Sequence, residues 1–154
     1  MSSVFGFSQK KLSKLLNELN NESIPYITVS ELAIRKSEAI LLDSRELEEY
    51  KISHLKDAIY VGYDDFKIKK TIKQLNSKEQ TIVVYCSLGI RSEDIAEKLK
   101  KAGYLNVYNL YGGIFEWKNK DFKVYDSKEV ETEKVHTFNE EWSKWLKKGV
   151  KIYD

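Results

Sequence analysis

The chain has one cysteine, one proline and two histidines among its 154 residues. A single thiol cannot close an internal disulfide, and no second cysteine is present to resolve a mixed disulfide. The few cysteines and histidines form no cluster with the spacing of a zinc site, so we expect no metal and no organic cofactor. This cysteine usage is typical of a reducing compartment, and it predicts a cytoplasmic protein.

Long apolar runs and an excess of one charge are also missing. No stretch approaches the roughly 18 apolar residues of a membrane span, and the first residues do not form a signal peptide. Lys and Arg number 26 against 24 Asp and Glu, which gives no electrostatic reason to expect nucleic acid or membrane as a partner. A hydrophobic content of 42% instead predicts a folded, globular chain with one compact domain.

Two extensions flank the central part of the chain. Residues 1–24 are predicted to form an amphipathic helix that ends near Asn20, because four leucines recur at helical spacing: Leu12, Leu15, Leu16 and Leu19. The tail, residues 124–154, is predicted to contain a short helix that ends at Gly149. One face of that helix would carry Trp142, Trp145 and Leu146.

Residues 25–123 alternate between short apolar runs and helix-compatible polar stretches. The runs predicted as strands are Tyr26–Val29, Ala39–Leu42, Ala58–Val61, Thr81–Tyr85 and Asn106–Leu110. Two of them, at 39–42 and 81–85, lack polar alternation, as parallel strands do when helices cover both faces. Helical spacing from Ser92 to Ala102 follows the fourth run. The pattern predicts an α/β domain with a central, mainly parallel five-stranded sheet flanked by helices on both faces.

Cys86 follows the fourth predicted strand directly, and its loop leads into the next helix. Backbone N–H groups and the positive end of that helix favour a thiolate at this place. Gly89 allows loop amides to turn inward, and Arg91 adds a permanent positive charge. A lone cysteine is more often a small buried hydrophobe, and a lone arginine is more often solvated. The combination of all three residues in a strand-loop-helix setting favours a reactive cysteine.

The loop resembles the active loop of the rhodanese family, which has the form Cys-x-x-Gly-x-Arg. Two further segments are similar to the signatures of that family: the first contains Asp43, Arg45, Glu49, Tyr50, His54 and Ala58, and the last contains Gly112, Gly113 and Trp117. Ser53 and Asp57 stand where the family commonly has glycine. The resemblance covers residues 25–123 and implies a rhodanese domain, with the extensions at 1–24 and 124–154 outside it.

The resemblance implies a thiosulfate sulfurtransferase-like enzyme with Cys86 as its catalytic nucleophile. The thiolate would attack the outer sulfur of thiosulfate or of a persulfide donor, and the resulting persulfide would pass its sulfur to a thiol or to cyanide. A protein could serve as donor or acceptor. Arg91 would bind the anionic oxygens of the donor. The rest of the substrate loop would be formed by Ser87, Leu88, Gly89, Ile90 and Ser92.

Other polar residues near these motifs are expected to have structural roles. Asp43 and Arg45 lie at the end of a predicted central strand and are expected to support the site as an ion pair rather than to catalyse. The resemblance implies a structural hydrogen-bonding role for His54, whereas the sequence identifies no partner for His136. Ser92 is expected to support the loop, although serine at a helix start more often caps backbone amides.

Two other functions remain open at this point. Phosphatases and arsenate reductases also use a cysteine and an arginine on an anion-binding loop, but five residues separate the two in their loops. Only four residues lie between Cys86 and Arg91, which suits sulfur better than a phosphoryl group. The second alternative is a rhodanese-like module that carries persulfide or docks another protein and has little turnover of its own.

Overall fold

The computed structural model describes residues 2–153, with the side chains of residues 10–153. Its main sheet has five strands in the order β1-β5-β4-β2-β3, and every neighbouring pair is parallel. The strands are β1 (Tyr26–Ile27), β2 (Ala39–Asp43), β3 (Ile59–Tyr60), β4 (Thr81–Tyr85) and β5 (Asn106–Leu110). All five lie within or directly beside the apolar runs predicted as strands. The predicted α/β fold is therefore confirmed, and the sheet is parallel throughout.

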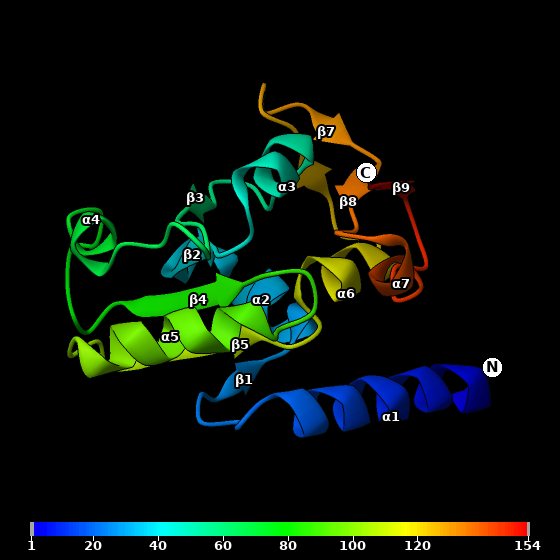
Figure 1. Cartoon of the computed structure of the whole chain (residues 1–154), viewed down its shortest axis with the longest axis horizontal. Helices are drawn as coiled ribbons and strands as arrows, with labels where there is room; N and C mark the ends of the chain where they lie inside the picture. The colour runs from blue at the N-terminus through cyan, green and yellow to red at the C-terminus, as the bar shows by residue number, and fades with distance from the viewer. Residues whose placement is uncertain (1, 154) are drawn as a thin grey trace.

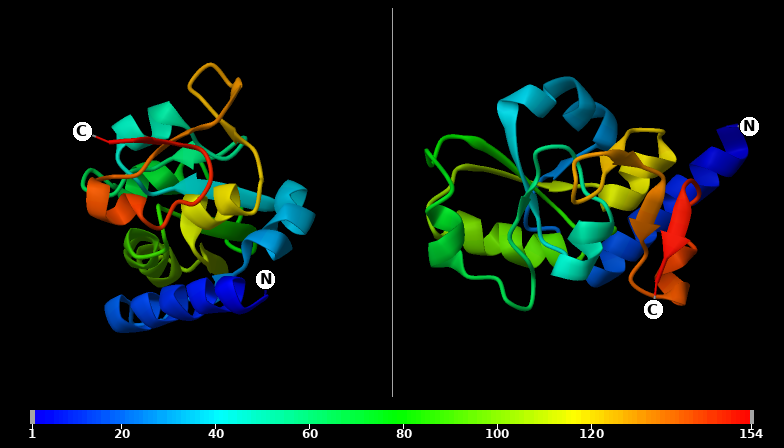
Figure 2. Two further views of the ribbon diagram at one scale, coloured as in Figure 1. Left: turned by 90° about the vertical axis from the view of Figure 1, so that its right-hand side faces the viewer. Right: turned by 90° about the horizontal axis from the view of Figure 1, so that it is seen from above.

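Helices surround this sheet. They are α1 (Ser2–Leu19), α2 (Val29–Arg35), the 3-10 turn η1 (Lys36–Glu38), α3 (Leu47–Ile52), α4 (Ile68–Ile72), α5 (Arg91–Lys101), α6 (Gly113–Asn119) and α7 (Glu140–Ser143). Seen from above, α2 and α5 lie on opposite sides of the sheet (Figure 2). The predicted helix at 92–102 corresponds to α5.

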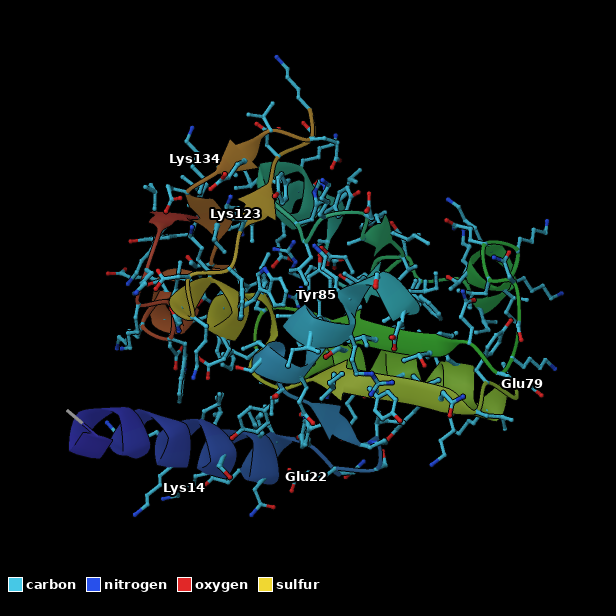
Figure 3. The ribbon with its side chains drawn as sticks, turned by 180° about the vertical axis from the view of Figure 1, so that it is seen from behind. Lys14, Glu22, Glu79, Tyr85, Lys123 and Lys134 are labelled. Carbon is cyan, nitrogen blue, oxygen red and sulfur yellow. The ribbon has the colours of Figure 1, made fainter. Side chains whose placement is uncertain are left out.

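The side chains of β4 explain why both faces of the sheet are covered. Val83 and Tyr85 belong to one buried cluster, which includes residues of α1, α2 and α6. Ile82 and Val84 alternate with them and belong to a second cluster, which includes residues of α5. Alternate strand residues point to opposite faces, so an all-apolar strand needs a core on each side. Tyr85 accordingly lies deep in the molecule, whereas Lys14 and Glu79 extend outward (Figure 3).

The tail folds back onto the domain through two small sheets. Antiparallel strands β6 (Val124–Tyr125) and β7 (Glu131–Thr132) form one, and parallel strands β8 (Lys134–His136) and β9 (Val150–Ile152) form the other. Strand β8 packs against α3, and α7 lies at the end of the molecule toward which β4 points (Figure 1). These strands were not predicted, because each is only two or three residues long.

The first helix ends at Leu19, beside its predicted end near Asn20; Leu12 and Leu16 are buried, and Leu19 is 53% exposed. One detail of the predicted tail helix is wrong. The tail helix ends at Ser143 rather than at Gly149. The Asn119 side chain accepts hydrogen bonds from the backbone N–H groups of residues 147 and 148 and donates one to the carbonyl of residue 145. These hydrogen bonds take the place of the backbone bonds that a longer helix would form.

Within residues 2–153, no helix has the length and apolar character that a membrane crossing requires.

Candidate active site around Cys86

Cys86 lies at the carboxyl end of β4, beside the end of β2. From β2 the chain leads outward to β3 at one edge of the sheet, whereas from β4 it leads through α5 to β5 on the other side. The two connections therefore diverge, and a crevice forms between them. In open parallel sheets, ligands bind at such a reversal of strand order.

The cysteine sulfur is enclosed by its own loop. Cys86 is 1% exposed, and its Sγ accepts a hydrogen bond from the backbone N–H of Gly89 at 3.2 Å. The hydroxyl of Ser92 lies 3.4 Å from the sulfur. Since Arg91 begins α5, the sulfur also faces the positive end of that helix. The Gly89 N–H and the positive end of α5 are both placed to stabilise a negative charge on the sulfur.

Two asparagines hold the far side of the loop. The carbonyl of Gly89 accepts hydrogen bonds from Nδ2 of Asn20 at 2.8 Å and from Nδ2 of Asn109 at 2.9 Å. Oδ1 of Asn109 accepts the Ser92 hydroxyl at 2.6 Å, so Ser92 does not cap α5. Sequence reasoning missed both asparagines. Of the two, only Asn109 could have been found from the sequence, because it is a polar residue at a strand end that is otherwise buried.

Gly113 allows the first turn of α6 to support the cysteine loop. The N–H groups of Ile114 and Phe115, in the first turn of α6, donate to the carbonyls of Cys86 at 2.9 Å and Ser87 at 3.2 Å. A Cβ at Gly113 would lie 2.4 Å from the Cys86 oxygen, which is too close for any side chain. Glycine at 113 therefore permits this close approach of α6 to the cysteine loop.

Arg91 forms a bidentate ion pair with Glu49 of α3. Its two terminal nitrogens lie 2.8 and 2.9 Å from the two carboxylate oxygens, and one of them also donates to the Ser87 hydroxyl at 3.0 Å. Burial raises the pKa of Glu49, but the hydrogen bonds and charge of Arg91 outweigh it, so the pKa is lowered. Burial lowers the pKa of Arg91, but Glu49 and Cys86 raise it overall. Both groups are therefore charged at neutral pH.

Asp43 and Arg45 form a second, fully buried ion pair. Arg45 donates Nε to Oδ1 of Asp43 at 3.0 Å and a terminal nitrogen to Oδ2 at 2.7 Å. The same nitrogen donates to the carbonyl of Ser53 at 2.6 Å, and the hydroxyl of Tyr85 donates to Asp43 at 2.8 Å. Burial, followed by the charge of Asp43, raises the pKa of Tyr85 well above its usual range. This network ties the ends of β2 and β4 together.

A cavity of about 180 Å³ opens onto Cys86. Five of its lining residues come from the cysteine loop: Cys86, Ser87, Leu88, Ile90 and Arg91. The other two, Phe138 and Trp142, come from the tail. The guanidinium of Arg91 lies 5.1 Å from the centre of the Phe138 ring. Sequence reasoning singled out Trp142 on the tail helix but favoured a core position for it, and no signal in the sequence pointed to Phe138.

The two histidines lie outside this cavity lining. His54 places Nδ1 2.9 Å from the carbonyl of Tyr50 and Nε2 3.0 Å from Glu129, which ties α3 to the tail. Nδ1 of His136 accepts the backbone N–H of Phe138 at 3.0 Å, so the structure supplies the partner that the sequence did not. Among the described residues, no group of three or more His, Cys, Asp or Glu side chains is arranged to hold a metal ion.

The central part of the chain is similar to known proteins. The model of the rhodanese-like domain matches residues 28–120. Among curated proteins, the tRNA uridine(34) hydroxylase of Hamiltonella defensa is 35% identical over 99 residues, which cover 60% of this chain and 28% of that protein. The enzyme of the same name from Aster yellows witches'-broom phytoplasma is 30% identical over 105 residues, covering 65% and 34%. The chain thus spans about a third or less of the length of these two relatives.

Solved structures include two informative matches. A protein from Bacillus halodurans superposes with a TM-score of 0.60 at 26% identity, and the match covers 82% of this chain and 86% of that one. A thiosulfate sulfurtransferase from Pseudomonas aeruginosa superposes with a TM-score of 0.64 at 17% identity over 90% of this chain and 26% of its own. At that identity the second match shows a shared fold.

Proposed function

Because the chain belongs to the rhodanese-like domain family, we propose that it is a sulfurtransferase that carries sulfur as a persulfide on Cys86. The observation that supports this most directly is the enclosed sulfur, which accepts the Gly89 N–H at the start of α5. Such a setting stabilises negative charge both on a thiolate and on the outer sulfur of a persulfide.

The reaction has two steps. The Cys86 thiolate attacks the outer sulfur of thiosulfate or of a persulfide; a sulfur–sulfur bond forms to Cys86, the original bond breaks, and sulfite or a thiolate leaves with its electron pair. A thiol or cyanide then attacks the outer sulfur of the Cys86 persulfide and restores the thiolate. With a single cysteine, the discharge requires an external acceptor. Free thiols persist in reducing compartments, so we place this reaction in the cytoplasm.

The first experiment is to mix the reduced protein with thiosulfate or with an organic persulfide and to measure its intact mass. We expect one added sulfur atom, which cyanide removes as thiocyanate. Cys86→Ser keeps the side-chain volume nearly unchanged and should abolish the adduct while the circular dichroism spectrum stays the same. An adduct on the serine variant would refute the mechanism, and no adduct with either donor would favour a docking module.

The names of the curated relatives favour a second candidate, which is a part in the hydroxylation of uridine 34 in tRNA. The chain matches only 28% and 34% of those two proteins, so this candidate concerns the matched segment alone. Since hydroxylation is an oxidation, the test incubates the chain with unmodified tRNA in the presence of O2 and analyses the nucleosides by mass spectrometry. Cys86-dependent hydroxyuridine would support it, whereas unchanged tRNA together with sulfur loading of Cys86 would leave sulfur transfer as the function.

A further inference from the structure

The tail places two aromatic side chains at the mouth of the Cys86 cavity. Phe138 adopts a left-handed backbone conformation with φ of 71°, and its N–H is held by His136. Asn139 caps α7 by accepting the N–H of Trp142 at 2.8 Å. The neighbouring backbone is fixed by the pairing of β8 with β9. These contacts fix the backbone at Phe138 and Trp142, and both residues are part of the cavity wall.

Among the described residues that line the cavity, Arg91 is the one cation, and its charge is already neutralised. The guanidinium of Arg91 makes two hydrogen bonds to Glu49 and one to Ser87, and it lies over the Phe138 ring. The side chain of Glu49 is 3% exposed, so solvent screens this pair weakly. A thiosulfate dianion entering the cavity therefore meets a balanced ion pair rather than a free positive charge. It would also have to give up hydration that the pair does not replace.

The remaining wall is mainly apolar. Leu88, Ile90, Phe138 and Trp142 contribute four of the seven lining residues. A cavity of about 180 Å³ is smaller than the sites that hold drug-sized ligands, which begin at roughly 300 Å³. The size suits a short organic chain that ends in sulfur, and the wall favours an uncharged chain.

We infer that Phe138 and Trp142 make the Cys86 site selective for small persulfides with an apolar organic group, in preference to thiosulfate and other anionic donors. This inference rests on the proposed sulfurtransferase function and names its substrate class. In the step, Cys86 thiolate attacks the outer sulfur of R–S–SH and a new sulfur–sulfur bond forms. The donor bond breaks, R–S⁻ leaves with the electron pair, and the proton stays on the transferred sulfur. No further oxidant or reductant is needed.

The test compares three donors on the full chain: propyl persulfide, a persulfide of the same length that ends in a sulfonate, and thiosulfate. Loading of Cys86 is followed by intact mass in single-turnover experiments. Each rate is divided by the rate with N-acetylcysteine, which removes differences in intrinsic reactivity. We expect the normalised preference for propyl persulfide over the sulfonate to be about tenfold, equivalent to 1.4 kcal/mol. Thiosulfate should be used least well.

Variants connect the preference to the named residues. Phe138→Ala and Trp142→Ala should each reduce the preference to about threefold or less, whereas Tyr153→Ala should leave it unchanged. Tyr153 is a fitting control because it is an aromatic residue of the same tail, is 43% exposed against 47% for Phe138, and is not part of the cavity wall. Glu49→Gln releases the charge of Arg91 and should increase the use of thiosulfate and of the sulfonate.

The outcomes separate this inference from the function on which it rests. If none of the three donors loads Cys86, the sulfurtransferase function itself fails. If all load it, but thiosulfate or the sulfonate is used as well as propyl persulfide by the wild-type chain, only the substrate class is wrong. This comparison needs no variant. A preference that survives both aromatic substitutions would overturn the role given to Phe138 and Trp142.

Discussion

Gly113 offers a demanding test of how the cysteine loop is held. It stands where β5 turns into α6, with φ of 55°. In Gly113→Ala, the new Cβ would lie 2.4 Å from the carbonyl oxygen of Cys86 and 2.5 Å from that of Ser87. Both carbonyls belong to the backbone and accept N–H groups from α6, so the overlap is relieved only if the loop and the helix move apart.

The cost has two parts. A left-handed backbone conformation costs an alanine about 1–2 kcal/mol. Overpacking in a closed environment typically adds about 1–3 kcal/mol. The free energy of unfolding should therefore fall by about 2–5 kcal/mol, which for a domain of this size lowers Tm by about 4–20 °C. Displacement of the loop by ~1 Å should also slow sulfur loading of Cys86 by roughly 100-fold.

Gly103→Ala is the matched control. Gly103 follows the opposite end of α5 from Arg91 and also has a positive φ, of 100°. The nearest atoms to its added Cβ belong to the flexible side chain of Lys78, at 3.2 Å or more. We expect Gly103→Ala to lose only the stability that the left-handed backbone conformation costs an alanine, and to load sulfur at the normal rate. Thermal unfolding and intact-mass loading measure both quantities. If Gly113→Ala loads sulfur at the same rate as Gly103→Ala, the loop does not depend on this close approach.

Two further predictions concern the buried ion pairs. Asp43→Asn leaves Arg45 without a counter-charge in the core, so urea unfolding should show a loss of about 3–5 kcal/mol, and a loss under 1 kcal/mol would contradict the pairing. Glu49→Gln should cost about 2–3 kcal/mol at pH 7. Because Arg91 lowers the pKa of Glu49, the pair stabilises the fold above the ordinary glutamate pKa of about 4.3, and its contribution is lost as the pH falls through the folded value. The difference between wild type and variant should therefore shrink near pH 3; a constant difference would mean that charge is not the cause.

The fold was largely predictable because a strand that is buried on both faces has a recognisable local sequence pattern. The residues of β4 form a continuous apolar run, and helical spacing follows after Cys86, so the type of each element can be inferred without knowing its neighbours. The tail strands have no such sequence pattern. They pair with one another over two or three residues each, and β8 packs against α3, which only the folded chain brings close.

The site residues likewise divide into those that the sequence predicts and those that only the folded chain brings together. Cys86, Gly89 and Arg91 are neighbours in the sequence, so their spacing and their place between a predicted strand and a predicted helix pointed to an anion-stabilising loop. The partner of Arg91 comes from another element. Glu49 lies on α3, in the connection that follows β2, and it meets the loop at the crevice between this connection and the one that follows β4. Asn20 lies still farther away, at the end of α1, and acts through a side-chain amide that carries no distinctive sequence pattern.

Phe138 shows why the substrate class is harder to infer than the chemistry. An exposed aromatic residue in an irregular tail gives no periodic signal, and its ring reaches the site only through a left-handed backbone turn. Yet it lies over Arg91, whose charge Glu49 already balances. The residues to which we assign the reaction of Cys86 lie mainly in one short loop, whereas those that we infer to select its donor come from α3 and from the tail. A chain with the same loop and a different tail should therefore keep the reaction of Cys86 and change its donor.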